Sequence, residues 1–509
     1  MTQGVFPFQY EVEKKTGGLT ALAGLPPYLE FGHVMGLAKS IESRLNIRGG
    51  DQGWSDVQTV MALVLLNLAG GESISDLDIL EGDEGFCRIL REYEGFGKTR
   101  KERRALKKRL RKQKKRSVPS PSSTTRYLSN FHDAQQEQLR PAEGSFIPAH
   151  NDRLRSLIGI HGDMAKFVQQ RSPETVATLD ADATLVATNK RQALYCYKGG
   201  KAYQPLNVYW AEQDLILHTE FRDGNVWAGT DKLRVTIEAL DVLPSGVTKV
   251  YFRGDTAAYQ HDLMGYFARG DNTRFKVIEF AIGAKVTEAF KASVRDVEES
   301  QWHKLYRRTK KGLVDTGQQY AEVCFVPAEL AKTKNGPEYR YLAIREPLEQ
   351  QETLPEMDEQ ISLPFPTIDL GPTKYKVTGI VTNRDIPADE LIWWYRQRCG
   401  KSEQVHSVMK DDLAGGRLPS GNFGANAAWW HIMIIALNLS NAMKRLVLGG
   451  TWACKRMKAI RFCLINLPGR LLTCSRTLTV RLVGGHPSNE LLFEMRRKIL
   501  SLCESGLSP

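Results

Sequence analysis

Two aspartates, Asp180 and Asp182, stand inside an apolar stretch of the sequence, TVATLDADATLV (residues 175–186). This stretch predicts a buried β-strand, and alternation along a strand places both carboxylates on one face. Asp is disfavoured in strands, and an ionised carboxylate away from water is costly unless it is paired, hydrogen-bonded or bound to a metal. A strand end with one Asp in a turn and one as a helix cap would also explain the pair, so the neighbouring segments must decide.

Two further acidic residues stand where a metal site would need them. Asp255 follows the apolar stretch VTKVYFRG, at the carboxyl end of a predicted strand, where open α/β sheets bind ligands. Glu403 lies on a predicted helix that Pro387 opens, with Lys410 two turns further along the same face. His406 shares that face, but a lone histidine there is more often a surface residue than a ligand. Three hard oxygen donors suit Mg²⁺ or Mn²⁺, which can activate water at one oxygen of a phosphodiester and stabilise the leaving oxygen at the other.

The elements that would position these residues begin near residue 174, where strand periodicity sets in. Three adjacent strands followed by alternating helix and strand are typical of a mixed α/β sheet. After the aspartate strand, the expected strands are residues 207–213, 214–221, 247–255 and 274–282, and the expected helices are 228–240 and 256–270. Residues 284–372 predict a β-rich insertion, after which a strand at 374–383 returns to the sheet and one long helix, 388–413, carries Glu403.

The flanking regions are predicted to be mostly helical. In the N-terminal region we expect helices at Leu29–Leu45, from Ser55 to Gly70 with Ser55 as N-cap, after Ser73, and at Glu84–Glu92. Short helices of this kind are used on DNA in helix-turn-helix domains, but small bundles do many things. The C-terminal region predicts an apolar helix at 425–446, a strand pair at 470–483 and a final helix at 489–502.

A dense basic run separates the N-terminal helices from the core. Residues 98–116 contain 13 Lys or Arg and one Glu, which accounts for the whole net charge of +12 of the chain. The run offers little to bury, so it is either a solvated helix or disordered until a partner arrives, and its charge favours nucleic acid. Residues 119–125, with two prolines, predict a linker or hinge after it. The basic residues expected to contact DNA phosphates are Lys98, Arg100, Lys101, Arg103, Arg104, Lys107, Lys108, Arg109, Arg111, Lys112, Lys114, Lys115 and Arg116.

The composition excludes several other classes of protein. A chain of 509 residues predicts about three domains, and 42% hydrophobic with 25% charged residues is typical of a soluble globular protein. The longest apolar run, Trp429–Leu439, is too short to span a bilayer, and the N-terminus has no signal-peptide pattern. Eight scattered cysteines fit reduced thiols in a cytosolic protein and argue against a zinc site.

These residues also carry a family resemblance. The segments LDADAT, YFRGDTAAY and YRQRCGKSEQVHSVMK resemble the three catalytic blocks of ribonuclease-H-like DDE transposases. They look like the group 1 DDE transposases of bacterial insertion sequences (insertion-sequence family 1380), which are related to the piggyBac elements, and the resemblance runs from about residue 25 to the C-terminus. The D-x-T pattern of the family falls on Asp182, with Asp180 left as a supporting or substitute ligand, and the second and third acidic positions fall on Asp255 and Glu403.

The third block departs from the family pattern by one residue. The family has Tyr, two residues, Arg, three residues, Glu, six residues and Lys, whereas this sequence has Tyr395, Arg398, Glu403 and Lys410, with an extra residue between the Arg and the Glu. In an ideal helix this turns Arg398 by about 100° away from the face of Glu403. Either Gly400 marks a π-bulge that absorbs the residue, or Arg396 takes over the phosphate contact.

The resemblance implies a ribonuclease-H-like catalytic core that cuts DNA at the inverted-repeat ends of an insertion sequence and joins the 3′ hydroxyls to target DNA. It implies two Mg²⁺ or Mn²⁺ ions held by Asp182, Asp255 and Glu403, further DNA contacts from Tyr395, Arg398 and Lys410, a homodimer in a synaptic complex, and a location in the bacterial cytoplasm at the nucleoid. The expected segments are 1–150 (helical DNA-binding and dimerisation region), 151–283 (first part of the core), 284–372 (insertion), 373–416 (end of the core) and 417–509 (C-terminal region).

Two other functions remain open from the sequence. One is a catalytically inactive, domesticated DNA-binding protein, which the irregularity at Cys399 and Gly400 would suit. The other is a basic RNA-binding or architectural protein with structural carboxylates, which three acidic positions at separate element ends argue against.

Overall fold

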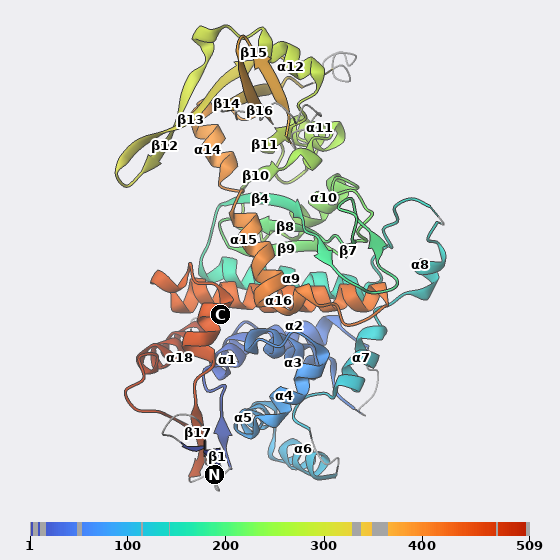
Figure 1. Ribbon diagram of the computed structural model, residues 1–509. Helices are drawn as coiled ribbons and strands as arrows, with labels where there is room; N and C mark the ends of the chain where they lie inside the picture. Colours follow the sequence, from blue (N-terminus) through green and yellow to red (C-terminus); the bar gives the residue numbers. More distant parts are fainter. Residues whose placement is uncertain are drawn as a thin grey trace. The chain divides into compact units, whose positions relative to one another are not determined.

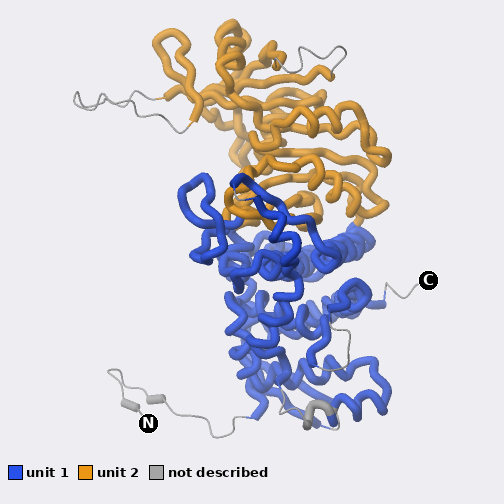
Figure 2. Tube along the Cα trace, turned by 90° about the vertical axis from the view of Figure 1, so that its right-hand side faces the viewer, with its two compact units in different colours: residues 1–172, 186–203, 407–509 blue, residues 173–185, 204–406 orange. Residues whose placement is uncertain are grey.

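The computed structural model describes residues 2–3, 9–10, 17–47, 53–112, 116–141, 143–327, 337–348, 365–474 and 477–504. The chain divides into two compact units, which are coloured separately in Figure 2. Unit 1 consists of residues 1–172, 186–203 and 407–509, and unit 2 consists of residues 173–185 and 204–406. The N- and C-terminal regions therefore belong to the same unit, and the acidic positions Asp182, Asp255 and Glu403 all belong to the other.

Unit 2 is built on a ten-stranded sheet with the order β12-β13-β14-β16-β11-β10-β4-β8-β9, and β15 pairs with β16 outside that path (Figure 1). Around the aspartate strand, β8 and β9 are antiparallel neighbours, while β10 and β11 run parallel to β4. The strands in this part are β4 (Val176–Ala183), β8 (Leu206–Trp210), β9 (Leu215–Glu220), β10 (Lys249–Gly254) and β11 (Glu279–Ala284). The helices between them are α10 (Lys232–Val242) and α11 (His261–Arg269).

The strand order β9-β8-β4-β10-β11, three antiparallel strands followed by two parallel ones, is that of a ribonuclease-H-like core. The predicted mixed α/β fold with a ribonuclease-H-like core is therefore confirmed. All five predicted strands are present, within a few residues of their predicted bounds. Their buried apolar side chains, such as Leu179, Phe252 and Phe280, explain why the sequence signal was strong here.

The insertion does not form a separate layer but extends the same sheet. It contributes α12 (Glu288–Arg295), β12 (His303–Thr309), β13 (Gly312–Val323), β14 (Arg340–Pro347) and β15 (Thr367–Leu370). Strand β16 (Thr373–Thr382) pairs with both β11 of the core and β14 of the insertion. Because one sheet runs through both parts, the insertion is fixed relative to the aspartate strand by continuous backbone hydrogen bonds.

The prediction of one continuous helix at 388–413 is wrong. The structure has α14 (Ala388–Arg396), then a break, then α15 (Lys401–Ser407) and a π-helical turn at Val408–Asp412. Gly400 lies in the break with a φ of +74°, a left-handed conformation that ends helices and that glycine adopts without strain. The predicted π-bulge at Gly400 is therefore wrong as well, since the π turn comes later.

Unit 1 is mostly helical, as predicted. Its helices include α1 (Pro26–Val34), α2 (Leu37–Arg44), α3 (Asp56–Ala69), α4 (Leu77–Gly82), α5 (Glu84–Glu94), α7 (Pro121–Ser129), α8 (Ala134–Gln138), α9 (Asp152–Arg171), α16 (Phe423–Met443), α17 (Met457–Ile460) and α18 (Asn489–Glu504). Its short strands are β3 (Leu19–Thr20), β5 (Val186–Ala187), β6 (Leu194–Tyr195), β7 (Lys201–Tyr203), β17 (Gly469–Cys474) and β18 (Thr477–Leu482), and β1 (Thr2–Gln3) pairs with β2 (Gln9–Tyr10). Every residue of α16 is buried, which is typical of a helix that is apolar on all sides.

Several local predictions in unit 1 can be compared with the structure. Ser55 caps α3 in a capping box with Gln58, and Gly70 ends the helix with a φ of +99°, as predicted. The predicted helix Leu29–Leu45 is instead two helices, because Gly36 between them has a φ of +76°. The predicted linker 119–125 is wrong in part, since Ser120 caps α7, whose first residue is Pro121.

The basic run forms helix α6 (Arg100–Lys112), which matches the solvated-helix alternative for the described residues. Among the described residues, no single helix is long and apolar enough to cross a membrane, and only the bent pair Asp56–Ala69 and Ile74–Gly82 meets that criterion by length and composition.

Candidate active site

The negative charge of Asp180 is neutralised by an ion pair with Arg253. Its two carboxylate oxygens accept hydrogen bonds from Arg253 Nε at 2.7 Å and Arg253 Nη2 at 2.8 Å, and both side chains are almost fully buried. Arg253 stands opposite Asp180 on the parallel neighbour β10 and also donates to the carbonyl of Trp394 at 2.7 Å. A bidentate buried pair of this kind leaves no open position for a metal at Asp180.

Asp182 and Asp255 lie beside each other at the carboxyl ends of adjacent parallel strands. The last paired residues of β4 and β10 are Ala181 and Gly254, and each aspartate follows one of them. Neighbouring strands are about 4.8 Å apart, so the two carboxylates are in electrostatic contact. Asp255 Oδ1 also accepts a hydrogen bond from the backbone of Ala257 at 3.2 Å, which fixes the turn after β10.

The charge of Asp182 is only partly compensated by its surroundings. The pKa of Asp182 is raised from 3.8 to about 6, chiefly by burial and also by the neighbouring Asp255, while the cations Arg398 and Lys232 act in the opposite direction. Arg398 Nη1 lies 3.4 Å from Asp182 Oδ2, so this contact is a loose ion pair. A pKa raised despite two nearby cations means that the site can accept more positive charge.

Lys232 was not predicted as a site residue. It is the first residue of α10, its side chain is 1% exposed, and its Nζ lies 3.3 Å from Asp255 Oδ1. Burial lowers the pKa of Lys232, while Asp255 and Asp182 act against that change. A single lysine at the start of a helix gives no sequence signal, because only the fold brings it to the two carboxylates.

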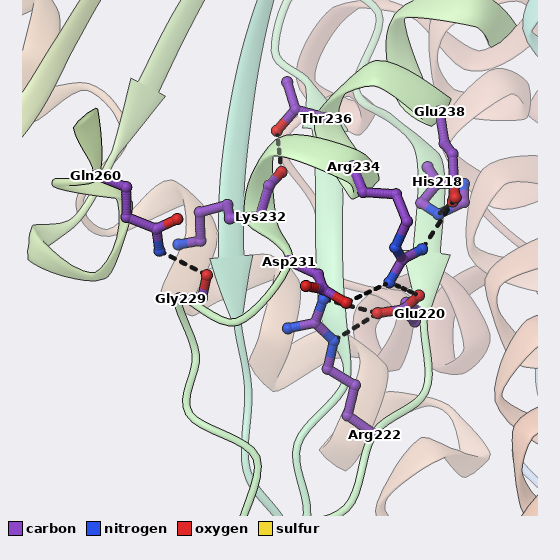
Figure 3. A network of polar contacts seen from close by, with 10 residues as sticks. All are labelled: His218, Glu220, Arg222, Gly229, Asp231, Lys232, Arg234, Thr236, Glu238 and Gln260. Carbon is purple, nitrogen blue, oxygen red and sulfur yellow. Dashed lines mark hydrogen bonds and ion pairs between the residues drawn. The ribbon is translucent and has the colours of Figure 1, made fainter. Parts of the chain in front are cut away.

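The start of α10 is held by a network of charged side chains (Figure 3). Glu220 accepts from Arg222 Nε and from Arg234 Nη2, each at 2.7 Å, and Arg234 Nη1 donates to Glu238 at 2.9 Å. In Figure 3, Lys232 leaves the helix on the side of Gln260, opposite to Arg234. The network thus anchors the helix that carries Lys232 to strand β9.

Of the two arginines considered for the phosphate contact, only Arg398 reaches the aspartates. Arg396 instead donates from Nη2 to Gln318 Oε1 at 2.7 Å, on the insertion. Arg398 follows the end of α14, so the helical rotation that would have turned it away does not apply. Tyr395 lies next to it, with the guanidinium of Arg398 5.8 Å from the centre of its ring, and burial raises the pKa of the Tyr395 phenol.

Glu403 is not brought to the two aspartates. It is exposed on α15, and the described residues contain no group of three His, Cys, Asp or Glu side chains placed to hold a metal ion. The left-handed Gly400 ends α14 before α15 begins, so the single helix on which the sequence places Glu403 does not form. The role of Glu403 as third ligand remains a prediction.

The residues present fit a Mg²⁺ or Mn²⁺ ion that is completed by substrate. Mg²⁺ is commonly bound through one or two carboxylates together with phosphate oxygens and water. Asp182 and Asp255 can supply the two carboxylates. Asn207, opposite Asp182 on β8, is buried, and its Nδ2 donor has no acceptor among the described residues. An unused donor and a carboxylate whose charge is only partly compensated, at one strand end, indicate a site that receives an oxygen-bearing ligand together with a cation.

The other predicted DNA contacts belong to unit 1. In the basic run, Lys98 and the described side chains in the first part of α6 are exposed, and Arg116 pairs with Asp78 at 2.5 Å. The side chains of Lys107, Arg109, Arg111 and Lys112, and residues Lys114 and Lys115 as a whole, lie outside the described part. Lys410 lies on the π-helical turn. DNA contact by these residues remains a prediction.

Comparison with known proteins gives one family match. The family model described as "Transposase DDE domain group 1" matches residues 9–503. Among solved structures, the chain is similar to the piggyBac transposase in a synaptic complex with hairpin DNA, with 10% sequence identity over 94% of this chain and 80% of that chain and a TM-score of 0.38. No curated protein matches the sequence.

Proposed function

Because the chain belongs to the group 1 DDE-domain transposases, we propose that it cuts DNA at the inverted-repeat ends of an insertion sequence and joins the released ends to target DNA. The observation that supports catalysis most strongly is the pair Asp182 and Asp255 at the ends of adjacent parallel strands. Among the described residues, Arg398 and Lys232 are the cations that act on Asp182, and its pKa is nevertheless raised to about 6.

The reaction is a pair of phosphodiester displacements. Water attacks the phosphorus at the element end, a new P–O bond forms, the bond to the 3′ oxygen breaks, and that oxygen takes up a proton. The 3′ hydroxyl then attacks a target phosphate, loses its proton, and displaces the 3′ oxygen of the target strand. Two Mg²⁺ or Mn²⁺ ions, when bound, would activate the attacking oxygen and stabilise the leaving oxygen.

The residues around the two aspartates have separate roles in binding the metal and the DNA. Asp182 and Asp255 would hold the metal, and Arg398 and Lys232, each paired with one of the two carboxylates, offset the repulsion between them. Asn207 supplies a donor for a phosphate oxygen or a water molecule beside Asp182. Glu403 is the third ligand when α15 moves about the break at Gly400 on binding DNA. Tyr395 and Lys410 contact the DNA backbone.

The partners follow from the chemistry. The substrate is double-stranded DNA, both at the element ends and at the target, and two copies of the chain hold the two ends in a synaptic complex. The basic run on α6 supplies sequence-independent attraction to phosphates. A bacterial cytoplasm, at the nucleoid, is the compartment in which such a substrate is found.

A second candidate function is a DNA-binding protein that has lost catalysis. The observation that favours it is the absence of a three-carboxylate group among the described residues, with Glu403 exposed. Asp182 and Asp255 argue against it, because an inactive protein gains nothing from two adjacent, partly buried carboxylates.

An end-cleavage assay separates the two functions. Purified protein is incubated with a labelled duplex that contains an end of its own element, with Mg²⁺ or with EDTA, and the products are tested for a free 3′ hydroxyl at the boundary. The proposal predicts metal-dependent cutting at the boundary that is lost in Asp182→Asn and in Asp255→Asn. Binding to the end without cutting in either Mg²⁺ or Mn²⁺ would support the inactive protein instead.

A further inference from the structure

The insertion carries a two-stranded ribbon that leaves the sheet of unit 2 (Figure 1). Strand β13 pairs with β14 only from Gln319 to Val323, so within the described residues its first half pairs with β12 alone. A register shift after Lys304 bends the ribbon, and its outer part pairs Tyr306 with Asp315 and Arg308 with Leu313. An isolated pair of strands is only marginally stable by itself, so this extension calls for an explanation.

The outer part of the ribbon is strongly basic. We define the basic ribbon as residues 303–316, which contain five Lys or Arg and one acidic residue, Asp315. Lys304 pairs with that Asp at 3.3 Å. The other four cations are exposed and have no acidic partner among the described residues: Arg307, Arg308, Lys310 and Lys311.

These four cations point in different directions. Alternation along the strands places Arg307 and its cross-strand neighbour Val314 on one face, and Arg308 with Leu313 on the other. Lys310 and Lys311 form the turn at the tip. Charged side chains on an edge strand often have no role beyond preventing aggregation. That role does not explain why cations lie on both faces of the ribbon, or why Leu313 and Val314 beside them are 67% and 50% exposed.

A cationic ribbon of this shape fits a groove of duplex DNA. The major groove admits a two-stranded β-ribbon, and phosphates line both of its walls, so cations on both faces of an inserted ribbon each meet a phosphate strand. Flat surfaces of protein or RNA would engage only one face. The exposed apolar side chains between the cations can contact base edges in the groove.

The ribbon is tied to the helix that precedes the active site. Trp393 on α14 donates from Nε1 to the carbonyl of Tyr306 at 2.8 Å, and Arg396 donates to Gln318, on β13 just beyond the basic ribbon, at 2.7 Å. The same helix carries Tyr395 and leads to Arg398, which lies against Asp182. DNA held by the ribbon is thereby held at a fixed place relative to the carboxylates.

We propose that the basic ribbon inserts into the major groove of the DNA duplex, with Arg307, Arg308, Lys310 and Lys311 on its phosphates. The proposal rests on the proposed function, because it takes DNA as the substrate of unit 2. It assigns a DNA contact to the insertion, which is separate from the basic run of unit 1.

A ribbon variant and a matched control test the proposal. The ribbon variant is Arg307→Gln, Arg308→Gln, Lys310→Gln and Lys311→Gln, and the control removes four exposed cations elsewhere on unit 2 by Arg269→Gln, Lys276→Gln, Arg295→Gln and Lys374→Gln. Both remove the same net charge. Because all eight side chains are exposed, thermal unfolding of both variants should match the wild type, and this measurement checks that they fold.

Binding to a duplex with an element end is measured by fluorescence anisotropy between 50 and 200 mM salt. The salt slope is the slope of the logarithm of the binding constant against the logarithm of the salt concentration, and each lost phosphate contact reduces its magnitude by about 0.9. Between those concentrations the affinity of the ribbon variant should therefore fall less than that of the wild type, by a factor on the order of 100, while the control keeps the wild-type slope. Methylation of guanine N7, which lies in the major groove, should be blocked by the wild type and the control but not by the ribbon variant.

The outcomes separate the two proposals. If the wild type binds and cuts end DNA but the ribbon and control variants share one salt slope and one N7 protection pattern, the ribbon proposal is wrong and its cations serve solubility. If the ribbon variant loses salt slope without any change in N7 protection, the ribbon lies on the outside of the backbone and the groove assignment is wrong. If the wild type itself neither binds nor cuts, the proposed function fails.

Discussion

Asp180 and Asp182 lie two residues apart on one strand, yet their replacement by Asn should have opposite effects on stability. Asp180→Asn leaves the guanidinium of Arg253, which is 3% exposed, without its charge partner. Removal of one member of a buried ion pair typically costs about 3–5 kcal/mol. In a unit of about 200 residues, 1 kcal/mol shifts the melting temperature by roughly 2–4 °C, so we expect a loss of about 6–20 °C.

Asp182→Asn should instead leave the metal-free protein as stable as the wild type or more stable. The fold raises the pKa of Asp182 from 3.8 to about 6, and about 1.4 kcal/mol per pKa unit gives an upper bound of ~3 kcal/mol for the cost of its charge. Because the folded chain binds this proton more tightly than the unfolded chain, the contribution of Asp182 to stability falls as the pH rises from about 4 to about 6 and is constant above that range. The gain in stability of Asp182→Asn over the wild type should therefore be largest at pH 7.5 and should vanish near pH 4.

Scanning fluorimetry in EDTA, at several pH values, measures both variants against the wild type. The double variant Asp180→Asn, Arg253→Met is the control, and it should recover part of the stability that Asp180→Asn loses, because no buried charge is left unpaired. Equal destabilisation by Asp180→Asn and Asp182→Asn at pH 7.5 would refute the division of the two residues into a structural and a metal-binding carboxylate. So would an effect of Asp182→Asn that does not change with pH.

Three further predictions concern other parts of the chain. Glu403→Gln should abolish end cleavage while binding to the ends persists, and Glu390→Gln, also exposed on the neighbouring helix α14, should change neither; near wild-type cleavage by Glu403→Gln would exclude Glu403 as third ligand. Deletion of residues 98–116 should flatten the salt dependence of DNA binding, since six to ten phosphate contacts correspond to roughly 10³- to 10⁵-fold in affinity between 50 and 200 mM salt; an unchanged slope would mean that DNA is held elsewhere, and a complete loss of discrimination between end and random DNA would make the run a recognition element. Ser55→Ala removes the cap of α3, whose hydroxyl accepts from Gln58 N at 3.2 Å, and should lower the free energy of unfolding by about 1 kcal/mol in a urea titration; no loss would mean that this cap adds nothing to stability.

The core of unit 2 could be predicted because its signals are local. Runs such as VTKVYFRG have the apolar pattern of strands, and Asp255 could be placed at a strand end from its position after Gly254. The resemblance to known catalytic blocks predicts Asp182 as the first carboxylate, which stays a prediction, and in the structure Asp180 is paired with Arg253. The choice between the two aspartates could not be made from spacing, because Arg253 lies 73 positions away in the sequence.

What the sequence did not predict depends on backbone conformation and on distant contacts. The sequence predicts one long helix that includes Gly400, but the left-handed conformation of Gly400 separates α14 from α15, and this separation affects where Arg398 and Glu403 lie. Lys232 reaches Asp255 only because β9, α10 and β10 fold back on one another. The sequence predicts the basic ribbon only as part of a β-rich insertion, because its separation from the sheet follows from the strand pairing.

Iron-induced cleavage of the protein backbone tests the central claim most directly. Fe²⁺ takes the place of Mg²⁺ at oxygen-ligand sites and, with ascorbate and peroxide, cuts the chain near its ligands. Without DNA we predict cuts near residues 182 and 255 that excess Mg²⁺ and the variant Asp182→Asn both suppress, and with end DNA an additional cut near residue 403. Cuts near 182 and 255 that persist in Asp182→Asn, or cuts confined to other parts of the chain, would contradict the assignment of Asp182 and Asp255 as the metal-binding pair of a DNA-cutting enzyme.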